Sequence, residues 1–330
     1  MEMVVKKAIC AAFAVCLIFF LSACSFTGIS VTDPPQKIYK EYIEPDISDD
    51  ADYPERISAE QSGCVVSVIS SGAIRVGRNT LIATNVFSGV VFSRKGYILT
   101  TSKAYNMDID YEGKHYSGIA NEVYAVLSDI YNDQRQYRLV LVNSDETAGL
   151  AVFRFYDSFS YYDKESSGQK EGLQFCAKFS GLQVQPGDAC TVIGNSLGNI
   201  FGSDSENFLP ETIGDLTLAV NGGYVAKTDY VSPSAASVNA VSEEQMPTAS
   251  CRYILVSAAV NLDMYGGAVF DKNGYLIGIP AEKFSSADSI YHNLCMVYPV
   301  EFITAYINSV SEEMRITMPY IIAGPEGVTE

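Results

Sequence analysis

The chain has 330 residues, of which 48% are hydrophobic and 18% charged, with 22 Tyr, 16 Phe and a formal net charge of −17. This composition is typical of a globular, β-rich protein with one large or two small domains, and it excludes an intrinsically disordered chain. So acidic a surface repels phosphate groups, and nucleic acid is therefore excluded as a partner.

The N-terminus has the pattern of a bacterial lipoprotein signal. Lys6 and Lys7 precede an apolar segment, residues 8–21, which is short for a transmembrane helix. The segment runs into Leu-Ser-Ala-Cys, which resembles the lipobox, in which the cysteine becomes the lipid-modified first residue after cleavage. We therefore predict a signal peptide over residues 1–23 and a lipid on Cys24 that holds the protein on the extracytoplasmic face of a bacterial cell membrane. An ordinary signal peptide with an incidental cysteine is the alternative.

Residues 24–60 are predicted to be a flexible linker. They contain four prolines, an acidic run and few regularly spaced apolar residues, so they cannot bury a continuous apolar face. The acidic cluster of Asp49, Asp50 and Asp52 is interpreted as solvated linker charge.

The sequence predicts no cofactor and no metal site. No pair of cysteines after the predicted signal has the C-x-x-C spacing of a zinc site or a redox dithiol. The odd number of these cysteines excludes complete pairing, and they are interpreted as small buried side chains with at most an incidental disulfide: Cys64, Cys176, Cys190, Cys251 and Cys295. Asp108, Asp110 and Glu112 begin like a calcium-binding loop, but Ile119 stands where such a loop needs its final carboxylate.

Residues 257–279 read SAAVNLDMYGGAVFDKNGYLIGI. The second half of this segment predicts two strands joined by an Asn-Gly turn. The whole segment resembles the nucleophile loop of trypsin-like serine proteases of the HtrA/Deg family, which runs D-A-A-I-N-x-G-N-S-G-G-P-L before a hairpin that ends in V-I-G-I. Tyr265 stands at the position of the nucleophilic serine. Asp263 and Met264 stand at the two oxyanion-turn positions before it.

Two earlier segments resemble the same family. Residues 89–105 read GVVFSRKGYILTTSKAY, where the family has S-G-V-I-x-x-x-G-Y-I-L-T-N-x-H-V-V, so that Lys103 occupies the place of the general-base histidine. The family then has the pattern A-x-x-V-x-x-D-x-x-x-D-L-A-V-L. Asp145 matches the first acidic position, and Gly149 stands at the second, whose aspartate orients the histidine in the family.

The resemblance extends over about residues 61–310 in six ordered blocks. It implies an all-β, trypsin-like (chymotrypsin) fold of two antiparallel six-stranded β-barrels, with a cleft between them and a short C-terminal helix. The end of the chain contains Met-Pro-Tyr-Ile-Ile, which resembles the first strand of a PDZ domain. The expected parts after the linker are an N-terminal barrel over 61–181, a C-terminal barrel with its closing helix over 182–310, and a tail over 311–330 with this truncated PDZ start.

The three matched positions do not hold a catalytic triad. A phenol and an ammonium group have reference pKa values of about 10 and 10.4, and a glycine has no carboxylate to hold a base. The resemblance therefore implies a non-catalytic pseudoprotease that binds an extended peptide or a protein partner in the cleft. Two interpretations of the replaced site stay open. Its residues are tolerated after loss of function, or Lys103, Asp263 and Tyr265 form a polar cluster that stabilises the empty cleft.

Two other functions compete with this one. The protein could be an active serine endopeptidase with displaced residues, although none of the candidate serines falls on a turn with adjacent glycines; these residues are Ser102, Ser196 and Ser257 as nucleophiles and His115 and His292 as bases. Alternatively, it could be a structural lipoprotein with no function in the cleft.

Overall fold

The computed structural model of the chain describes residues 40–43, 53–127, 136–163, 167–195, 218–231, 251–281 and 294–324. These residues belong to one compact unit, 38–330. The predicted signal peptide and Cys24 lie outside the described residues, as do Ser196 and His292. Within the described part of the chain, no helix has both the length and the apolar character that a membrane span requires.

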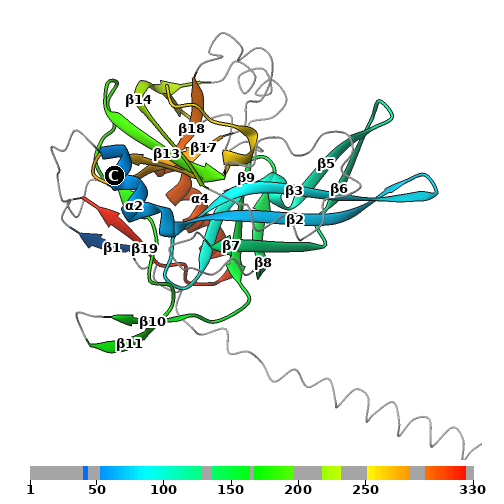
Figure 1. Cartoon of the computed structure of the whole chain (residues 1–330), viewed down its shortest axis with the longest axis horizontal. Helices are drawn as coiled ribbons and strands as arrows, with labels where there is room; N and C mark the ends of the chain where they lie inside the picture. Colours follow the sequence, from blue (N-terminus) through cyan, green and yellow to red (C-terminus); the bar gives the residue numbers. More distant parts are fainter. Residues whose placement is uncertain are drawn as a thin grey trace, which may run out of the picture. The chain divides into compact units, whose positions relative to one another are not determined.

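The first half of the unit is a closed β-barrel (Figure 1). Its six strands run in the order β2-β3-β4-β9-β8-β7 and are all paired antiparallel. Their bounds are β2 Val65–Val76, β3 Asn79–Val91, β4 Tyr97–Thr101, β7 Glu122–Leu127, β8 Gln136–Asp145 and β9 Leu150–Phe155. Fully buried Val, Ile, Leu and Phe side chains fill its interior.

The second half forms another barrel. Its sheet runs β17-β16-β13-β14-β15-β18, and the pairing of β18 with β17 closes it. The bounds are β13 Ala189–Asn195, β14 Leu218–Tyr230, β15 Tyr253–Val256, β16 Ala268–Asp271, β17 Leu276–Pro280 and β18 Cys295–Pro299. The Asn-Gly turn predicted between two strands joins β16 to β17, where Asp271 Oδ1 accepts hydrogen bonds of 2.9 Å from both Asn273 N and Tyr275 N.

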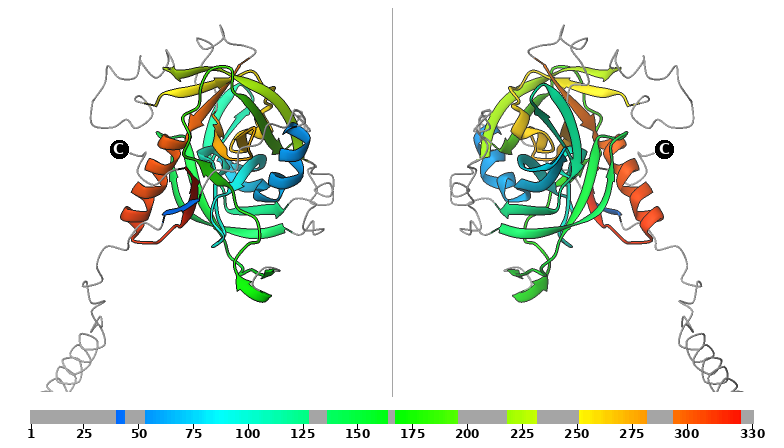
Figure 2. Two further views of the ribbon diagram at one scale, coloured as in Figure 1. Left: turned by 90° about the vertical axis from the view of Figure 1, so that its left-hand side faces the viewer. Right: turned by 90° about the vertical axis from the view of Figure 1, so that its right-hand side faces the viewer.

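These two barrels and a C-terminal helix confirm the predicted all-β, trypsin-like fold. Helix α4 (Val300–Met314) follows β18 directly, and its buried residues Ile303, Ile307 and Val310 have helical spacing. Tyr306 Oη donates to Asn143 Oδ1 at 2.9 Å and to Leu150 O at 3.1 Å, both on the first barrel. The C-terminal helix therefore bridges the two halves. It is seen side-on in Figure 2.

The structure differs from the sequence-based boundaries at both ends of the folded unit. Helix α2 (Tyr53–Gln61) lies within the predicted linker 24–60, yet its Ile57 is fully buried and its Tyr53 hydroxyl donates to Gly223 O at 3.3 Å. The 3₁₀ turn η1 (Ser62–Cys64) then leads into β2. The sequence predicted a linker because apolar residues are sparse here. The short helix is held instead by one buried isoleucine and by side-chain hydrogen bonds such as that of Tyr53.

Three short parallel strands extend the second barrel. They are β1 (Lys40–Ile43), β19 (Tyr320–Ala323) and β12 (Lys178–Ser180), in that order, and β12 reaches β17. The predicted tail 311–330 thus contains the end of α4 and strand β19. The predicted linker 24–60 contains β1, which pairs with β19. Tyr320, in the segment likened to a PDZ start, is buried against Phe179.

Two β-hairpins project from the barrels. The hairpin of β5 (Asn106–Tyr111) and β6 (Lys114–Ile119) lies beside the β2–β3 hairpin, where the Ile74 side chain packs on Gly118 (Figure 1). The second hairpin, β10 (Ser160–Asp163) with β11 (Gly168–Glu171), stands out from the body of the unit after β9 (Figure 2).

Candidate functional site

Ser88 on β3 joins the two barrels at the candidate site. Its N–H donates to Tyr265 O at 3.1 Å, and its Oγ donates to Asp263 O and accepts from Asn195 N, each at 2.7 Å. The serine is fully buried, and Thr100 Oγ1 on β4 donates to its carbonyl at 2.6 Å. The loop that resembles the nucleophile loop is therefore fixed to the first barrel through backbone atoms.

Lys103 lies in the 3₁₀ turn η2 (Ser102–Ala104), directly after β4. Thr101 caps this turn, because its Oγ1 accepts from Lys103 N at 3.4 Å. Lys103 is half-buried and has interactions with its surroundings. The neighbouring Ser102 N donates to Gly149 O at 3.0 Å, so positions 103 and 149 lie close together, as the resemblance implies.

Gly149 ends the turn between β8 and β9. Asp145 Oδ1 organises this turn by accepting from Thr147 N at 2.8 Å and Ala148 N at 3.0 Å. Gly149 has φ +69°, a left-handed conformation that favours glycine. A side chain at position 149 would collide with the hydroxyl of Tyr298, a buried residue of β18 in the second barrel. The place of a side chain at the predicted acid position is thus occupied by a tyrosine from the other barrel.

Tyr265 lies opposite, between the turn η7 (Leu262–Met264) and the paired glycines. A Cβ on Gly266 would lie 2.6 Å from Thr100 Oγ1 and 2.9 Å from Thr101 N, so only glycine allows this loop to reach the end of β4. The structure therefore brings the end of β4, Gly149 and the Tyr265 loop together. Tyr265 itself is half-buried and has interactions with its surroundings.

A pocket of about 430 Å³ opens beside Tyr265. Its walls are the segment 257–261 after β15, Ala281 after β17, and residues 294–296 at the start of β18. Small side chains and backbone dominate these walls, with Leu294 and Met296 as the larger apolar groups. More of its exposed lining is polar than apolar, and its volume is sufficient for a side chain of a bound ligand.

Asp263 is the buried charge of the site. The residue is only 6% exposed, and this burial raises the pKa of its carboxyl to about 6. Its backbone carbonyl is held by Ser88, which fixes the residue in place. The predicted cluster of Asp263 with Lys103 and Tyr265 stays a prediction.

Of the displaced candidates that the structure describes, Ser102 lies at this site in the turn η2 and Ser257 lies in the wall of the pocket. His115 lies on β6, where its Nε2 is 3.4 Å from Asp108 Oδ1 across the β5–β6 hairpin. Ser257 Oγ accepts from Tyr224 N at 2.9 Å. The five cysteines after residue 60 are free thiols, and in the described residues no three His, Cys, Asp or Glu side chains are grouped to hold a metal ion.

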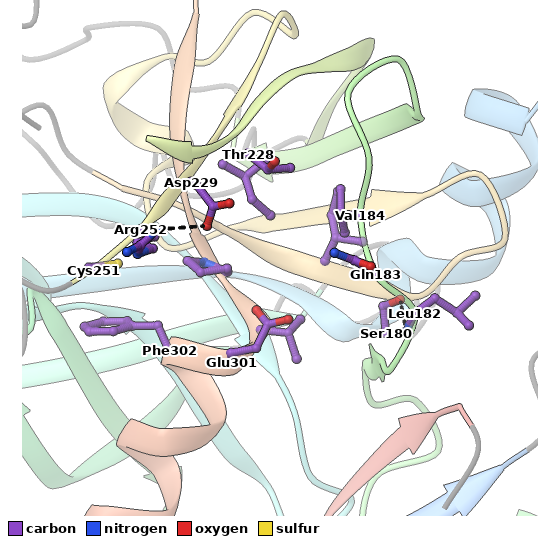
Figure 3. A pocket seen from close by; sticks show the side chains of 14 residues that line it. Ser180, Leu182, Gln183, Val184, Thr228, Asp229, Cys251, Arg252, Glu301 and Phe302 are labelled. Atoms are coloured by element: carbon purple, nitrogen blue, oxygen red, sulfur yellow. Dashed lines mark hydrogen bonds and ion pairs between the residues drawn. The ribbon is translucent and has the colours of Figure 1, made fainter. Parts of the chain in front are cut away.

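Figure 3 shows a second pocket, lined by residues of the C-terminal barrel and of α4. Its volume is about 410 Å³, and it is bounded by residues 180–184 and by the start of α4. Arg252 Nη1 lies 3.9 Å from Asp229 Oδ1 in its wall. Arg252 precedes β15 whereas Ser257 follows it, so this pocket is separate from the one beside Tyr265.

Sequence reasoning missed Ser88, Thr100 and Tyr298. Ser88 and Thr100 carried a signal, because they are polar residues inside strands whose neighbours are apolar. Tyr298 carried none, since its role depends on where β18 lies relative to Gly149.

We predict that Gly149→Ala lowers the free energy of unfolding by about 2–4 kcal/mol, because it adds backbone strain and a collision with Tyr298. In a protein that already carries Tyr298→Phe, which lacks the hydroxyl, Gly149→Ala should cost at least about 1 kcal/mol less than in the wild type. Urea unfolding of the four proteins in this cycle measures the coupling. If the two substitutions changed the free energy of unfolding additively, the Tyr298 hydroxyl would not be filling the space beside Gly149.

We predict that Asp263→Asn stabilises the protein above pH 7 and not at pH 4. The folded-state pKa of Asp263 lies above the unfolded one, so the native state binds the proton more tightly and stability falls as pH rises between about 4 and 6. The neutral amide should recover about 1–3 kcal/mol at the higher pH. Thermal unfolding across pH tests this, with the exposed Asp157→Asn as the control that shows no such dependence. Equal effects of Asp263→Asn at both pH values would contradict it.

Comparison with known proteins supports the fold and the family. The solved structure described as "HtrA-type protease AlgW with decapeptide" is similar over 79% of this chain and 68% of its own, with 19% sequence identity and a TM-score of 0.50. No curated protein matches the sequence. The model of the trypsin-like peptidase domain matches residues 87–279, more than half of the chain. The chain therefore belongs to the family of trypsin-like peptidase domains.

Proposed function

We propose that this protein is a lipoprotein of the bacterial cell envelope whose trypsin-like domain is a pseudoprotease. In this proposal the lipid on Cys24 holds it at the extracytoplasmic face of the membrane. The domain binds an extended peptide or a segment of a partner protein in the pocket beside Tyr265, and it does not cleave it.

The observation that carries the proposal is the environment of Gly149. A triad needs a carboxylate at this position to orient and stabilise the base. Here the residue has no side chain, its φ of +69° favours glycine, and the Tyr298 hydroxyl fills the adjacent space. The packing of both barrels around Gly149 therefore supports the absence of a triad acid at this position.

The other two positions agree with this interpretation. An ammonium group at Lys103 has no lone pair with which to accept a proton from a nucleophile. The oxygen of Tyr265 stands at the end of a long aromatic side chain, several bonds further from the backbone than a serine oxygen. The buried carboxylate of Asp263 places negative charge on the turn where an active protease binds an oxyanion, which opposes acyl transfer.

Binding remains possible without these groups. Residues 257–261 follow the end of β15 and run along the pocket, with Ser257, Ala259 and Asn261 exposed. An extended peptide gains affinity from main-chain hydrogen bonds to such a segment and specificity from side-chain pockets. The structure of similar fold, AlgW, was solved with a decapeptide, which is consistent with a peptide as the ligand class.

We predict that the purified protein retains extended peptides but neither cleaves a peptide library nor reacts with a fluorophosphonate probe. Ala259→Trp should block the pocket and weaken peptide binding at least about tenfold, a loss of about 1.4 kcal/mol. Ala59→Trp, on the exposed side of α2, is the matched control and should bind normally. Fluorescence polarisation with labelled peptides and mass spectrometry of the digests provide the two readouts.

Three outcomes would contradict this proposal. Cleavage of the peptide library, or labelling of Ser102, Ser196 or Ser257 by the fluorophosphonate probe, would identify an active endopeptidase with displaced residues. Absent peptide binding in the wild type would favour a structural lipoprotein, whereas equal binding by the wild type and both tryptophan variants would exclude the pocket beside Tyr265 as the binding site.

We predict that Cys24→Ala abolishes incorporation of an alkyne analogue of palmitate, because the thiol that carries the lipid is lost. Cys16→Ala, inside the apolar segment of the signal, is the control and should incorporate the label like the wild type. Labelling of Cys24→Ala at the wild-type level would exclude Cys24 as the attachment site.

A further inference from the structure

One face of the domain is basic although the chain as a whole carries a formal charge of −17. We name it the tyrosine–arginine face and define it by seven residues: Lys40, Arg94, Lys95, Arg138, Tyr156, Tyr161 and Tyr162. All four basic side chains are exposed. Two exposed acids, Glu41 and Asp157, lie next to Lys40 and Tyr156 in the sequence, so basic residues outnumber them. A third acid, Asp163, forms an ion pair with Lys170.

The tyrosines of this face lie against its arginines. The Arg138 guanidinium lies 5.8 Å from the ring centre of Tyr156, and that of Arg94 lies 5.9 Å from the ring centre of Tyr161. Arg94 Nη1 also donates to Tyr161 Oη at 3.2 Å. Tyr156 and Tyr162 are 65% and 62% exposed. Exposed tyrosines beside basic residues are typical of surfaces that lie at a membrane–water interface.

A pocket of about 400 Å³ opens within the same face. Its rim holds three basic residues, Lys40, Arg94 and Lys95, and one acid, Glu41, while Phe92, Tyr320 and Ile321 are among its apolar walls. An apolar floor below a basic rim suits a phospholipid, whose phosphate is anionic and whose glycerol and acyl parts are apolar.

The position of this face along the chain favours the same partner. Lys40, on its rim, begins β1, and only residues 25–39 separate it from Cys24. Fully extended, the chain from Cys24 to Lys40 spans about 58 Å at most. A lipid on Cys24 would therefore keep this face within reach of the membrane surface.

We propose that the tyrosine–arginine face lies on an anionic phospholipid surface and orients the domain on the membrane. The proposal rests on the proposed lipid attachment at Cys24, which brings the face to the membrane. Attraction between the basic residues and anionic lipids supplies the binding, since each Lys or Arg near such a surface contributes favourably within a Debye length.

The chain contains no tryptophan, so one substitution creates a unique fluorescent probe. The full-length lipidated protein carrying Tyr162→Trp is reconstituted into vesicles that contain brominated phosphatidylglycerol or, separately, brominated phosphatidylcholine. We expect a shift of the emission to shorter wavelength and quenching by the brominated phosphatidylglycerol. Tyr224→Trp, equally exposed at 58% on β14, is the matched control and should show neither effect.

Charge reversal tests the basis of the attraction. Arg94→Glu with Lys95→Glu, in the Tyr162→Trp background, should reduce the quenching by phosphatidylglycerol about tenfold or more, because four units of charge are changed. Arg75→Glu with Arg78→Glu, both exposed on the β2–β3 hairpin, makes the same change elsewhere and should leave quenching unaltered.

Three results would overturn the proposal. The first is identical emission of Tyr162→Trp and Tyr224→Trp in both vesicles, and the second is quenching that neither salt nor charge reversal reduces. The third is a shift that depends on protein concentration without vesicles, which would identify the face as a contact between copies. If Cys24 proves unmodified, the same fluorescence measurement on soluble protein mixed with the vesicles still tests whether the tyrosine–arginine face binds them. Failure of the lipid attachment is therefore distinguishable from failure of the membrane contact.

Discussion

The arrangement of the candidate site depends on Ser88. This one residue of β3 uses its N–H and its hydroxyl to bind three backbone groups of the second barrel, at Tyr265, Asp263 and Asn195. Because Ser88 is fully buried, any of these groups left without a partner would cost a substantial part of the domain's stability. The two barrels are thus held at a fixed distance at the point where a trypsin-like domain carries its active site.

These contacts involve the backbone of Asp263 and Tyr265 and not their side chains. Ser102 N binds Gly149 O in the same way, and Gly266 fits against Thr100 through its lack of a side chain. These backbone contacts therefore do not depend on which side chains stand at positions 263 and 265. This separation of geometry from chemistry explains how a fold can be kept while its reaction is not.

The sequence predicted the barrels because their signals are local: alternating strands, glycine turns and the segments that resemble a protease family. It also placed positions 103, 149 and 265 in loops that the structure brings together. It could not predict that Tyr298 fills the space beside Gly149, since that contact joins residues far apart in the chain. Helix α2 was missed for a different reason. Its stability comes from one buried isoleucine and from hydrogen bonds such as Tyr53 to Gly223, which leave no periodic pattern.

Asp263 and Tyr298 differ in how they bear on the proposed function. Once catalysis is lost, nothing but stability would act on the site, and substitutions that remove buried charge would be favoured. Tyr298 beside Gly149 agrees with such a change, because an aromatic ring fills space that an acid would require. Asp263 does not agree with such a change, because the burial that raises the pKa of its carboxyl to about 6 costs stability at neutral pH. In the proposed function, this cost is offset when a bound ligand contacts the carboxyl of Asp263.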